Sequence, residues 1–273
     1  MTYRPLILVT NDDGIQSPGL RAAARAVADL GDLLIMAPST QQTGAGRSYP
    51  ANVDDTIHPT HIVVNGKQLP AYTAKVSPAQ AARLAITDLA ERRIDLCISG
   101  INYGENIGSG VTISGTVGAA IEAGCAGIPA LAVSFETPQE YHLNHSDAVD
   151  FSVAAHFSRL FAQTVLKNGL PPQVDLLKID VPASATAQTG WRIGRVSRHR
   201  YYQSLPKHQR QAGGANYQIK FSPDHLEPDS DVYIFAVEKQ VAVVPMTIDL
   251  TAPVALSEVS QFLAAKEDAL QSG

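Results

Sequence analysis

The sequence has few of the residues that cross-linked or membrane-spanning proteins depend on. Its 273 residues include two cysteines and one tryptophan, and only 6% are aromatic. Cys97 and Cys125 lie in apolar surroundings without metal-ligand spacing, which predicts two buried, reduced thiols. No apolar run reaches the roughly 18 residues of a membrane span, and the start has no signal-peptide layout. We therefore expect a cytoplasmic protein with no membrane partner.

Positive charge is also scarce. The chain carries 21 Lys and Arg against 26 Asp and Glu, for a net charge of −5. This balance argues against broad binding to a nucleic-acid backbone. A basic and aromatic run at 195–202 leaves RNA contact as an alternative to a solvated hairpin or a subunit contact. A small anionic ligand remains compatible with the charge, because a bound metal reverses the local field.

Apolar strands and helix signals alternate through about the first 180 residues. Continuous apolar strands separated by helices are typical of a mostly parallel sheet covered on both faces. The dipeptide Asn65-Gly66 predicts one tight hairpin, between 61–64 and 68–73. The expected strands are 6–10, 33–37, 96–99, 130–134 and 176–179, and the expected helices are 20–30, 77–89, 116–123 and 147–167.

The pattern changes near Trp191. Residues 192–202 and 217–221 resemble exposed hairpin material, 233–244 a returning strand, and 256–270 a terminal helix. We predict a Rossmann-like α/β catalytic core over residues 1–185. We expect residues 186–273 to form a C-terminal extension, with a β-hairpin arm and a terminal helix, that is used in oligomerisation.

Two adjacent aspartates follow the first predicted strand. Residues 6–10 are β-formers, Asp12 and Asp13 come next, and Gly14 permits a sharp turn. Two unpaired carboxylates at a buried strand end repel each other and are costly to desolvate. A cation between them removes that cost, and oxygen ligands suit a hard divalent ion such as Mg²⁺ or Mn²⁺. The pair alone is equally consistent with an Asx turn or a helix cap.

Two further polar loops follow later strands. The loop at 39–48 is rich in hydroxyls and glycine, and the loop at 99–108 contains Asn102 and Asn106. In open parallel sheets, ligands bind beyond the carboxyl ends of the strands, so these loops are expected to converge with the aspartates. Asparagine beside glycine is also typical of simple turns.

The segment Ser114-Gly115-Thr116 opens a helix of small residues. Free N–H groups and the positive end of the dipole at a helix start favour a bound phosphate. Ser114 and Thr116 are equally residues that cap a helix without binding anything. A metal-binding pair and a phosphate site at one sheet edge together predict phosphoester chemistry.

These motifs in combination resemble those of the SurE family, the stationary-phase survival proteins, which are metal-dependent nucleotide phosphatases. Their order and spacing match over about residues 5–135, with weaker matches at 178–182 and 244–251. The matching segments are Val9-Thr10-Asn11-Asp12-Asp13-Gly14-Ile15, Ser99-Gly100-Ile101-Asn102 with Gly104 and Asn106, and Ser114-Gly115-Thr116-Val117.

The resemblance implies one divalent metal ion per subunit, held by two carboxylates, an amide and a hydroxyl. The hydroxyl position, where serine is usual, is occupied here by Thr43. The implied metal ligands are Asp12, Asp13, Thr43 and Asn102. The implied phosphate-binding residues are Asn106, Ser114, Gly115 and Thr116. Asp12 or Asp13 is expected to serve the chemistry as well, by activating water or by forming an aspartyl-phosphate.

The activity implied is 5′- or 3′-nucleotidase action on nucleoside monophosphates by a homodimer or homotetramer. The alternatives are a phosphatase for other small phosphate esters or short polyphosphate, and a nucleotide-binding module without turnover. Two departures from the family pattern, Gln80 in place of an acid and Asp180 in place of asparagine, concern pocket walls or helix packing. They bear on substrate preference more than on phosphatase chemistry.

Overall fold

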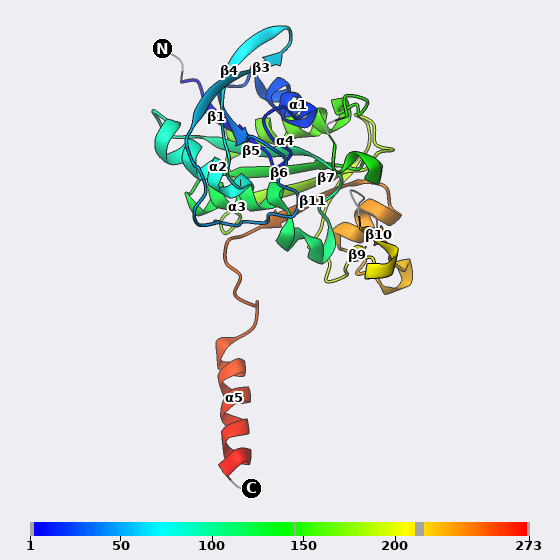
Figure 1. Ribbon diagram of the computed structural model, residues 1–273. Helices are drawn as coiled ribbons and strands as arrows, with labels where there is room; N and C mark the ends of the chain where they lie inside the picture. Colours follow the sequence, from blue (N-terminus) through cyan, green and yellow to red (C-terminus); the bar gives the residue numbers. More distant parts are fainter. Residues whose placement is uncertain (1–2, 145, 211–215, 272–273) are drawn as a thin grey trace.

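The computed structural model describes residues 3–144, 146–210 and 216–271. A nine-stranded sheet runs through the body of the protein in the order β3-β4-β2-β1-β5-β6-β7-β11-β8 (Figure 1). Its strands are β1 (Leu6–Thr10), β2 (Asp32–Pro38), β3 (His58–Val64), β4 (Lys67–Ala74), β5 (Leu96–Tyr103), β6 (Ala130–Phe135), β7 (Leu176–Val181), β8 (Trp191–Ile193) and β11 (Val241–Met246).

The centre of this sheet is parallel, as predicted. Every neighbouring pair from β4 through β7 is parallel, whereas β3 and β11 run antiparallel to β4 and β7. The chain passes from β1 to β2 on one side, while β5 lies on the other side of β1. The strand order therefore reverses between β1 and β5, and the carboxyl ends of these two strands flank the crevice in which such sheets bind ligands.

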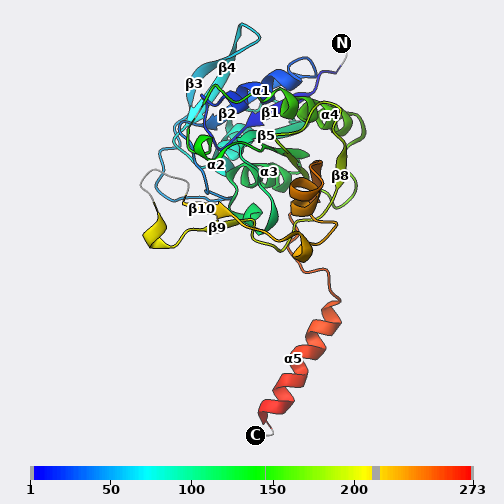
Figure 2. The same ribbon diagram turned by 90° about the vertical axis from the view of Figure 1, so that its right-hand side faces the viewer.

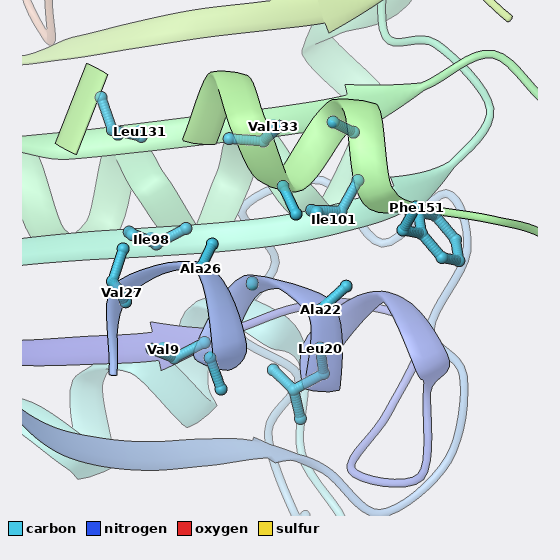
Figure 3. Close-up of a cluster of buried hydrophobic side chains, with 14 of the residues drawn as sticks. Val9, Leu20, Ala22, Ala26, Val27, Ile98, Ile101, Leu131, Val133 and Phe151 are labelled. Carbon is cyan, nitrogen blue, oxygen red and sulfur yellow. The ribbon is translucent and has the colours of Figure 1, made fainter. Parts of the chain in front are cut away.

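Helices cover both faces of the sheet (Figures 1 and 2). Helices α1 (Pro18–Val27) and α4 (Ser152–Asn168) pack together on one face, and α2 (Pro78–Leu84) and α3 (Gly115–Cys125) on the other. Figure 3 shows the core under α1, where Leu20 and Val27 meet Val9 and Ile98. These side chains are fully buried, and the removal of their apolar surface from water is the main contribution that holds the layers together.

Several boundaries differ from the sequence-based expectation. Strand β5 continues to Tyr103, so Asn102 lies within the strand and not in the loop after it. Helix α4 begins at Ser152 and not near 147. Shorter helical turns complete the structure: the π-type η1 (Ala85–Leu89) and η6 (Tyr233–Val237), and the 3₁₀ turns η2 (Gly108–Ile113), η3 (Gln139–Tyr141), η4 (Lys207–Gln209) and η5 (Pro223–His225).

The C-terminal part is built differently from the expectation. The hairpin is short, with β9 (Tyr202–Ser204) antiparallel to β10 (Tyr217–Ile219). Strand β8, expected as hairpin material, joins the main sheet beside β11. The predicted strand at 233–244 is wrong in its first half, which forms η6 and packs Ile234 and Phe235 into a buried cluster. A short apolar run does not by itself distinguish a buried strand from a buried helix.

The terminal helix α5 (Leu256–Gln271) confirms the helix predicted at 256–270, and it stands away from the body (Figures 1 and 2). Cys97 is buried, as predicted, but Cys125 is exposed because it is the last residue of α3. Across the described ranges, no helix combines the length and the hydrophobicity needed to span a membrane.

Candidate functional site

The turn after β1 and the cap of α1 are formed by residues other than Asp12 and Asp13. The side chain of Asn11 forms the turn: its Oδ1 accepts from the Gly14 N–H at 3.1 Å, and its Nδ2 donates to the Gly14 carbonyl at 3.2 Å. Ser17 caps α1. Asp12 and Asp13 are therefore needed neither for the turn nor for the cap, yet both are buried.

Burial of this pair is electrostatically unfavourable. Desolvation raises the pKa of Asp12 to about 6, opposed by a hydrogen bond from the Thr116 hydroxyl. Desolvation, and then the charge of Asp12, raise the pKa of Asp13 well above its ordinary value. No salt bridge joins either carboxylate to a lysine or arginine of the described ranges. Two buried anions without a counter-ion match the requirements of a cation site.

Neutral oxygen donors lie beside the pair. The Asn102 Nδ2 donates hydrogen bonds to the carbonyls of Tyr103 and Gly104, at 3.1 and 2.7 Å. No described group donates to its amide oxygen, which is therefore available as a ligand. Asp12, Thr43 and Asn102 line one pocket. Within the described residues there is no cluster of three or more His, Cys, Asp or Glu that could hold a metal. A metal here would have two carboxylates and neutral oxygens as ligands, a donor set that fits Mg²⁺ or Mn²⁺.

The loop that carries Thr43 is attached to the same site through its backbone. The Gln42 N–H donates to the Asp12 carbonyl at 2.7 Å, and the Gly46 N–H donates to the Ile113 carbonyl at 2.9 Å. This loop is thus attached both to the acidic pair and to the segment before α3. Thr43 itself is exposed to solvent at the pocket.

The start of α3 packs directly against Asp12. The Thr116 hydroxyl donates to Asp12 Oδ1 at 2.5 Å, and a Cβ at Gly115 would lie 2.7 Å from the Asp12 Cβ. Ser114 Oγ accepts from the Val117 N–H at 3.1 Å, so Ser114 is the N-cap of α3, the structural alternative to phosphate binding. Both hydroxyls thus have protein partners, and Thr116 orients Asp12.

A buried ion cluster holds the loop that follows β5. Lys178 Nζ lies 2.5 Å from Asp180 Oδ2 and 3.0 Å from Asp231 Oδ2, and all three side chains are fully buried. The free carboxylate oxygen of Asp180 accepts from the Asn106 N–H at 2.7 Å, and Asp231 accepts from the Gly108 N–H at 3.1 Å. The cluster therefore fixes the backbone of a pocket-lining segment from both the core and the C-terminal part.

No sequence motif marks several other residues that line the pocket or support it from behind. Gln41 Nε2 donates to Asp13 Oδ1 at 2.9 Å and to the His142 carbonyl at 2.8 Å. His142 is buried in the pocket wall, and its Nδ1 lies 2.5 Å from the Tyr217 hydroxyl. Burial lowers the pKa of His142.

The loops after β1, β2 and β5 and the short hairpin enclose a pocket of about 360 Å³, within the range of small-molecule sites. It brings together the predicted residues Asp12, Thr43, Asn102, Asn106 and Ser114. Asp13, Gly115 and Thr116 lie behind this surface, in contact with Tyr103, Gln41 or Asp12. Gln80, the departure from the family pattern, is in the capping box of α2 with Ser77 and does not line the pocket.

The fold and the site together define a Rossmann-like protein with an acidic pair at the point where the strand order reverses. The family model described as "Survival protein SurE" matches residues 7–203, and the chain belongs to this family. The curated relative "5′-nucleotidase SurE" of Thermococcus gammatolerans is 39% identical over 98% of both chains. The same-named protein of Thermococcus kodakarensis is 37% identical, over 95% of this chain and 99% of its own.

A solved structure agrees with this assignment. The crystal structure titled as the Sure protein from Aquifex aeolicus superposes with a TM-score of 0.68 at 26% sequence identity. The superposition covers 90% of this chain and 95% of that one. The mixed α/β fold with its mostly parallel sheet is therefore that of a SurE protein, as the motifs predicted.

Proposed function

We propose that this protein is a metal-dependent phosphomonoesterase that acts on nucleoside monophosphates, a 5′-nucleotidase in the sense of its relatives' names. The observation that carries the proposal is the pair of buried carboxylates, Asp12 and Asp13, which no described lysine or arginine neutralises; Asp12 lines a pocket at the carboxyl ends of β1 and β5, and Asp13 lies directly behind it. Near-full-length similarity to proteins named 5′-nucleotidase SurE supports the substrate class.

The residues proposed to hold one Mg²⁺ or Mn²⁺ per subunit are Asp12, Asp13, Thr43 and Asn102. When bound, the ion supplies a Lewis acid that offsets the charge of the phosphate oxygens. Thr116 and Gln41 serve as positioning residues, because each donates a hydrogen bond to one carboxylate and restricts its orientation. Thr43 in place of serine keeps the hydroxyl oxygen and adds a methyl group.

The phosphate is proposed to bind at Asn106 and at the first turn of α3, through Ser114, Gly115 and Thr116. The Thr116 hydroxyl already donates to Asp12, whereas Ser114 Oγ only accepts from the Val117 N–H, so the Ser114 O–H, the backbone N–H groups and the helix dipole are left for the phosphate. The nucleophile is proposed to be water, with Asp12 or Asp13 orienting or deprotonating it. Trapping a phosphoenzyme during turnover would replace this step by attack of an aspartate on phosphorus.

Phosphate release from a panel of substrates tests the proposal. The panel contains nucleoside 5′- and 3′-monophosphates, an aryl phosphate and short polyphosphate, each with Mn²⁺, with Mg²⁺ and with chelator. We expect metal-dependent release, fastest from nucleotides. Faster release from the other esters would favour a general phosphatase. Nucleotide binding without release from any substrate would identify a binding module.

The C-terminal extension is proposed to join copies of the chain into a homodimer or homotetramer. Leu256, Val259 and Leu263 share one face of α5 and are 73%, 41% and 59% exposed, and Leu250 in the preceding linker is 92% exposed. An apolar helix face that protrudes from the body matches a surface covered by a second copy. Light scattering of the double variant Leu256→Glu with Leu263→Glu should give a smaller mass than the wild type, and an unchanged mass would contradict the proposal.

The proposed compartment is the cytoplasm. The exposed, unpaired thiol of Cys125 is compatible with its reducing conditions.

A further inference from the structure

A group of aromatic side chains from the short hairpin lines the same pocket as the acidic pair. Tyr202 in β9 and Tyr217 in β10 have ring centroids 4.9 Å apart at 70°, and the His142 ring lies 6.1 Å from that of Tyr217. Neither phosphate nor metal needs an aromatic wall. A flat, partly polar ligand such as a nucleobase does, because ring faces provide stacking that tolerates any base.

Glu105 lies among these rings. Its side chain is only 4% exposed, and it lines the pocket with Tyr202 and Tyr217. No salt bridge connects it to a cation of the described residues. The hydroxyls of Tyr201 and Tyr202 lie beside its carboxyl group and interact with it, but neither Glu105 Oε2 nor the Tyr202 hydroxyl makes a well-formed hydrogen bond to a described residue.

An unpartnered buried acceptor is costly, and it commonly marks a place where a ligand provides the missing donor. The neighbouring ion cluster does not provide it, because Lys178 is already shared between Asp180 and Asp231. Burial raises the pKa of Glu105 to about 7. As acid or as carboxylate, the group keeps an oxygen that accepts a hydrogen bond.

We infer that Glu105, Tyr202 and Tyr217 form the base-recognition subsite of this protein: the tyrosines hold the nucleobase, and the Glu105 carboxyl accepts a hydrogen bond from an exocyclic amino group of the base. This inference rests on the proposed nucleotidase function and adds a specificity to it. Adenine and cytosine carry such an amino group, whereas hypoxanthine and uracil present a carbonyl oxygen at the same position. At a pH well above 7, where Glu105 is ionised and only accepts, the carbonyl would leave its carboxylate facing another acceptor.

The test compares substrates that differ in this one group. We measure kcat/KM at about pH 9, where Glu105 is ionised, for AMP against IMP and for CMP against UMP, with ribose 5-phosphate as the substrate that lacks a base. The wild type should prefer the amino-bearing nucleotide of each pair by about tenfold, the effect of one hydrogen bond to a buried group. Each ratio comes from one enzyme preparation, so it does not depend on the fraction of protein that is folded.

Glu105→Gln should lower both ratios towards one, because its amide can donate to the carbonyl as well as accept from the amino group. Tyr217→Leu should lower the ratio of AMP to ribose 5-phosphate by about fivefold or more through lost stacking. Glu91→Gln is the matched control. Glu91 is exposed and does not line the pocket, so all ratios should stay at the wild-type values.

The outcomes distinguish failure of the base-recognition subsite from failure of the proposed nucleotidase function. Equal kcat/KM within both pairs for the wild type, or ratios that Glu105→Gln leaves unchanged, would overturn the subsite while nucleotidase activity stands. No metal-dependent release from any nucleotide or from ribose 5-phosphate would overturn the proposed function itself, and the subsite with it.

Discussion

Replacing Asp12 by asparagine removes one charge from the buried pair and keeps the size of the side chain. Burial raises the pKa of Asp12 from 3.8 to about 6, so the ionised form is destabilised in the folded protein. At about 1.4 kcal/mol per pKa unit, the metal-free wild type loses about 3 kcal/mol of stability at pH 8. Asparagine avoids this loss and still offers an oxygen to the Thr116 hydroxyl. We expect metal-free Asp12→Asn to be more stable than the wild type by about 2–3 kcal/mol at pH 8.

The pH dependence fixes the sign of this prediction. Because the folded pKa lies above the unfolded pKa, the contribution of Asp12 to stability is fully present below about pH 4. It is lost as the pH rises through about 6. The advantage of Asp12→Asn should therefore be absent at pH 3.5, develop between about pH 4 and 6, and stay constant near pH 8.

Metal binding should reverse the order of stability. An ion that binds only the folded wild type adds about 4.1 kcal/mol at a concentration of 1,000 Kd, which exceeds the advantage of the metal-free variant. We expect Mn²⁺ to raise the Tm of the wild type by several degrees, and to leave that of Asp12→Asn nearly unchanged. The variant should also lose nucleotidase activity.

Urea denaturation in chelator at pH 3.5 and 8, followed by melting with added Mn²⁺, measures these effects. Asp55→Asn is the matched control, since Asp55 is exposed and makes no hydrogen bond within the described residues. A metal-free variant less stable than the wild type at pH 8 would refute the electrostatic argument. Full stabilisation of the variant by Mn²⁺ would refute the assignment of Asp12 as a ligand.

Three further predictions concern the surroundings of the site. Lys178→Met should lower the free energy of unfolding in urea by about 3–5 kcal/mol at pH 8, because it leaves the buried Asp180 carboxylate without its partner. The loss should be smaller at acidic pH, where Asp180 is protonated, and the second substitution Asp180→Asn should restore part of the lost stability. Failure of Asp180→Asn to rescue would contradict the ion-cluster argument. Gly118→Ala places a Cβ 2.3 Å from the Gly46 carbonyl oxygen and so pushes on the loop that carries Thr43. The KM for AMP should therefore rise severalfold, and the free energy of unfolding should fall by about 1–3 kcal/mol. An unchanged KM would show that substrate binding does not depend on the position of this loop. Dialysis of the wild type against chelator should abolish phosphate release, and Mn²⁺ should restore it; activity that survives chelation would exclude the proposed metal.

Much of the core could be predicted because its signals are local. The apolar run at 6–10, the helix that follows and the hairpin at Asn65-Gly66 depend on side-chain period and on the backbone freedom of a few residues. Both Asn65 and Gly66 adopt the positive φ that such a turn requires. The position of Asp12 and Asp13 at a strand end followed from the same local pattern.

Other features depend on contacts that no local pattern encodes. The apolar run at 233–237 forms a helical turn because Ile234 and Phe235 pack beside Ile107, far away in the chain. Lys178 and Asp180 alternate along a buried strand, which places them on one face, but their partner Asp231 comes from the C-terminal part. The wall formed by Tyr202 and Tyr217 was missed, because only hairpin pairing brings it to the pocket.

The sequence by itself determined the parts of this protein: the alternation of strands and helices, the turn that Gly14 permits after the first strand, and the chemical nature of the oxygen donors. These follow from short-range geometry, which neighbouring residues set. Only the tertiary structure decided that β5 lies beside β1, that Thr116 bonds to Asp12, and that both carboxylates are buried away from every lysine and arginine in the described ranges. Burial, electrostatic repulsion and pocket shape are properties of the whole packed chain, because they depend on which distant segments exclude water from a group.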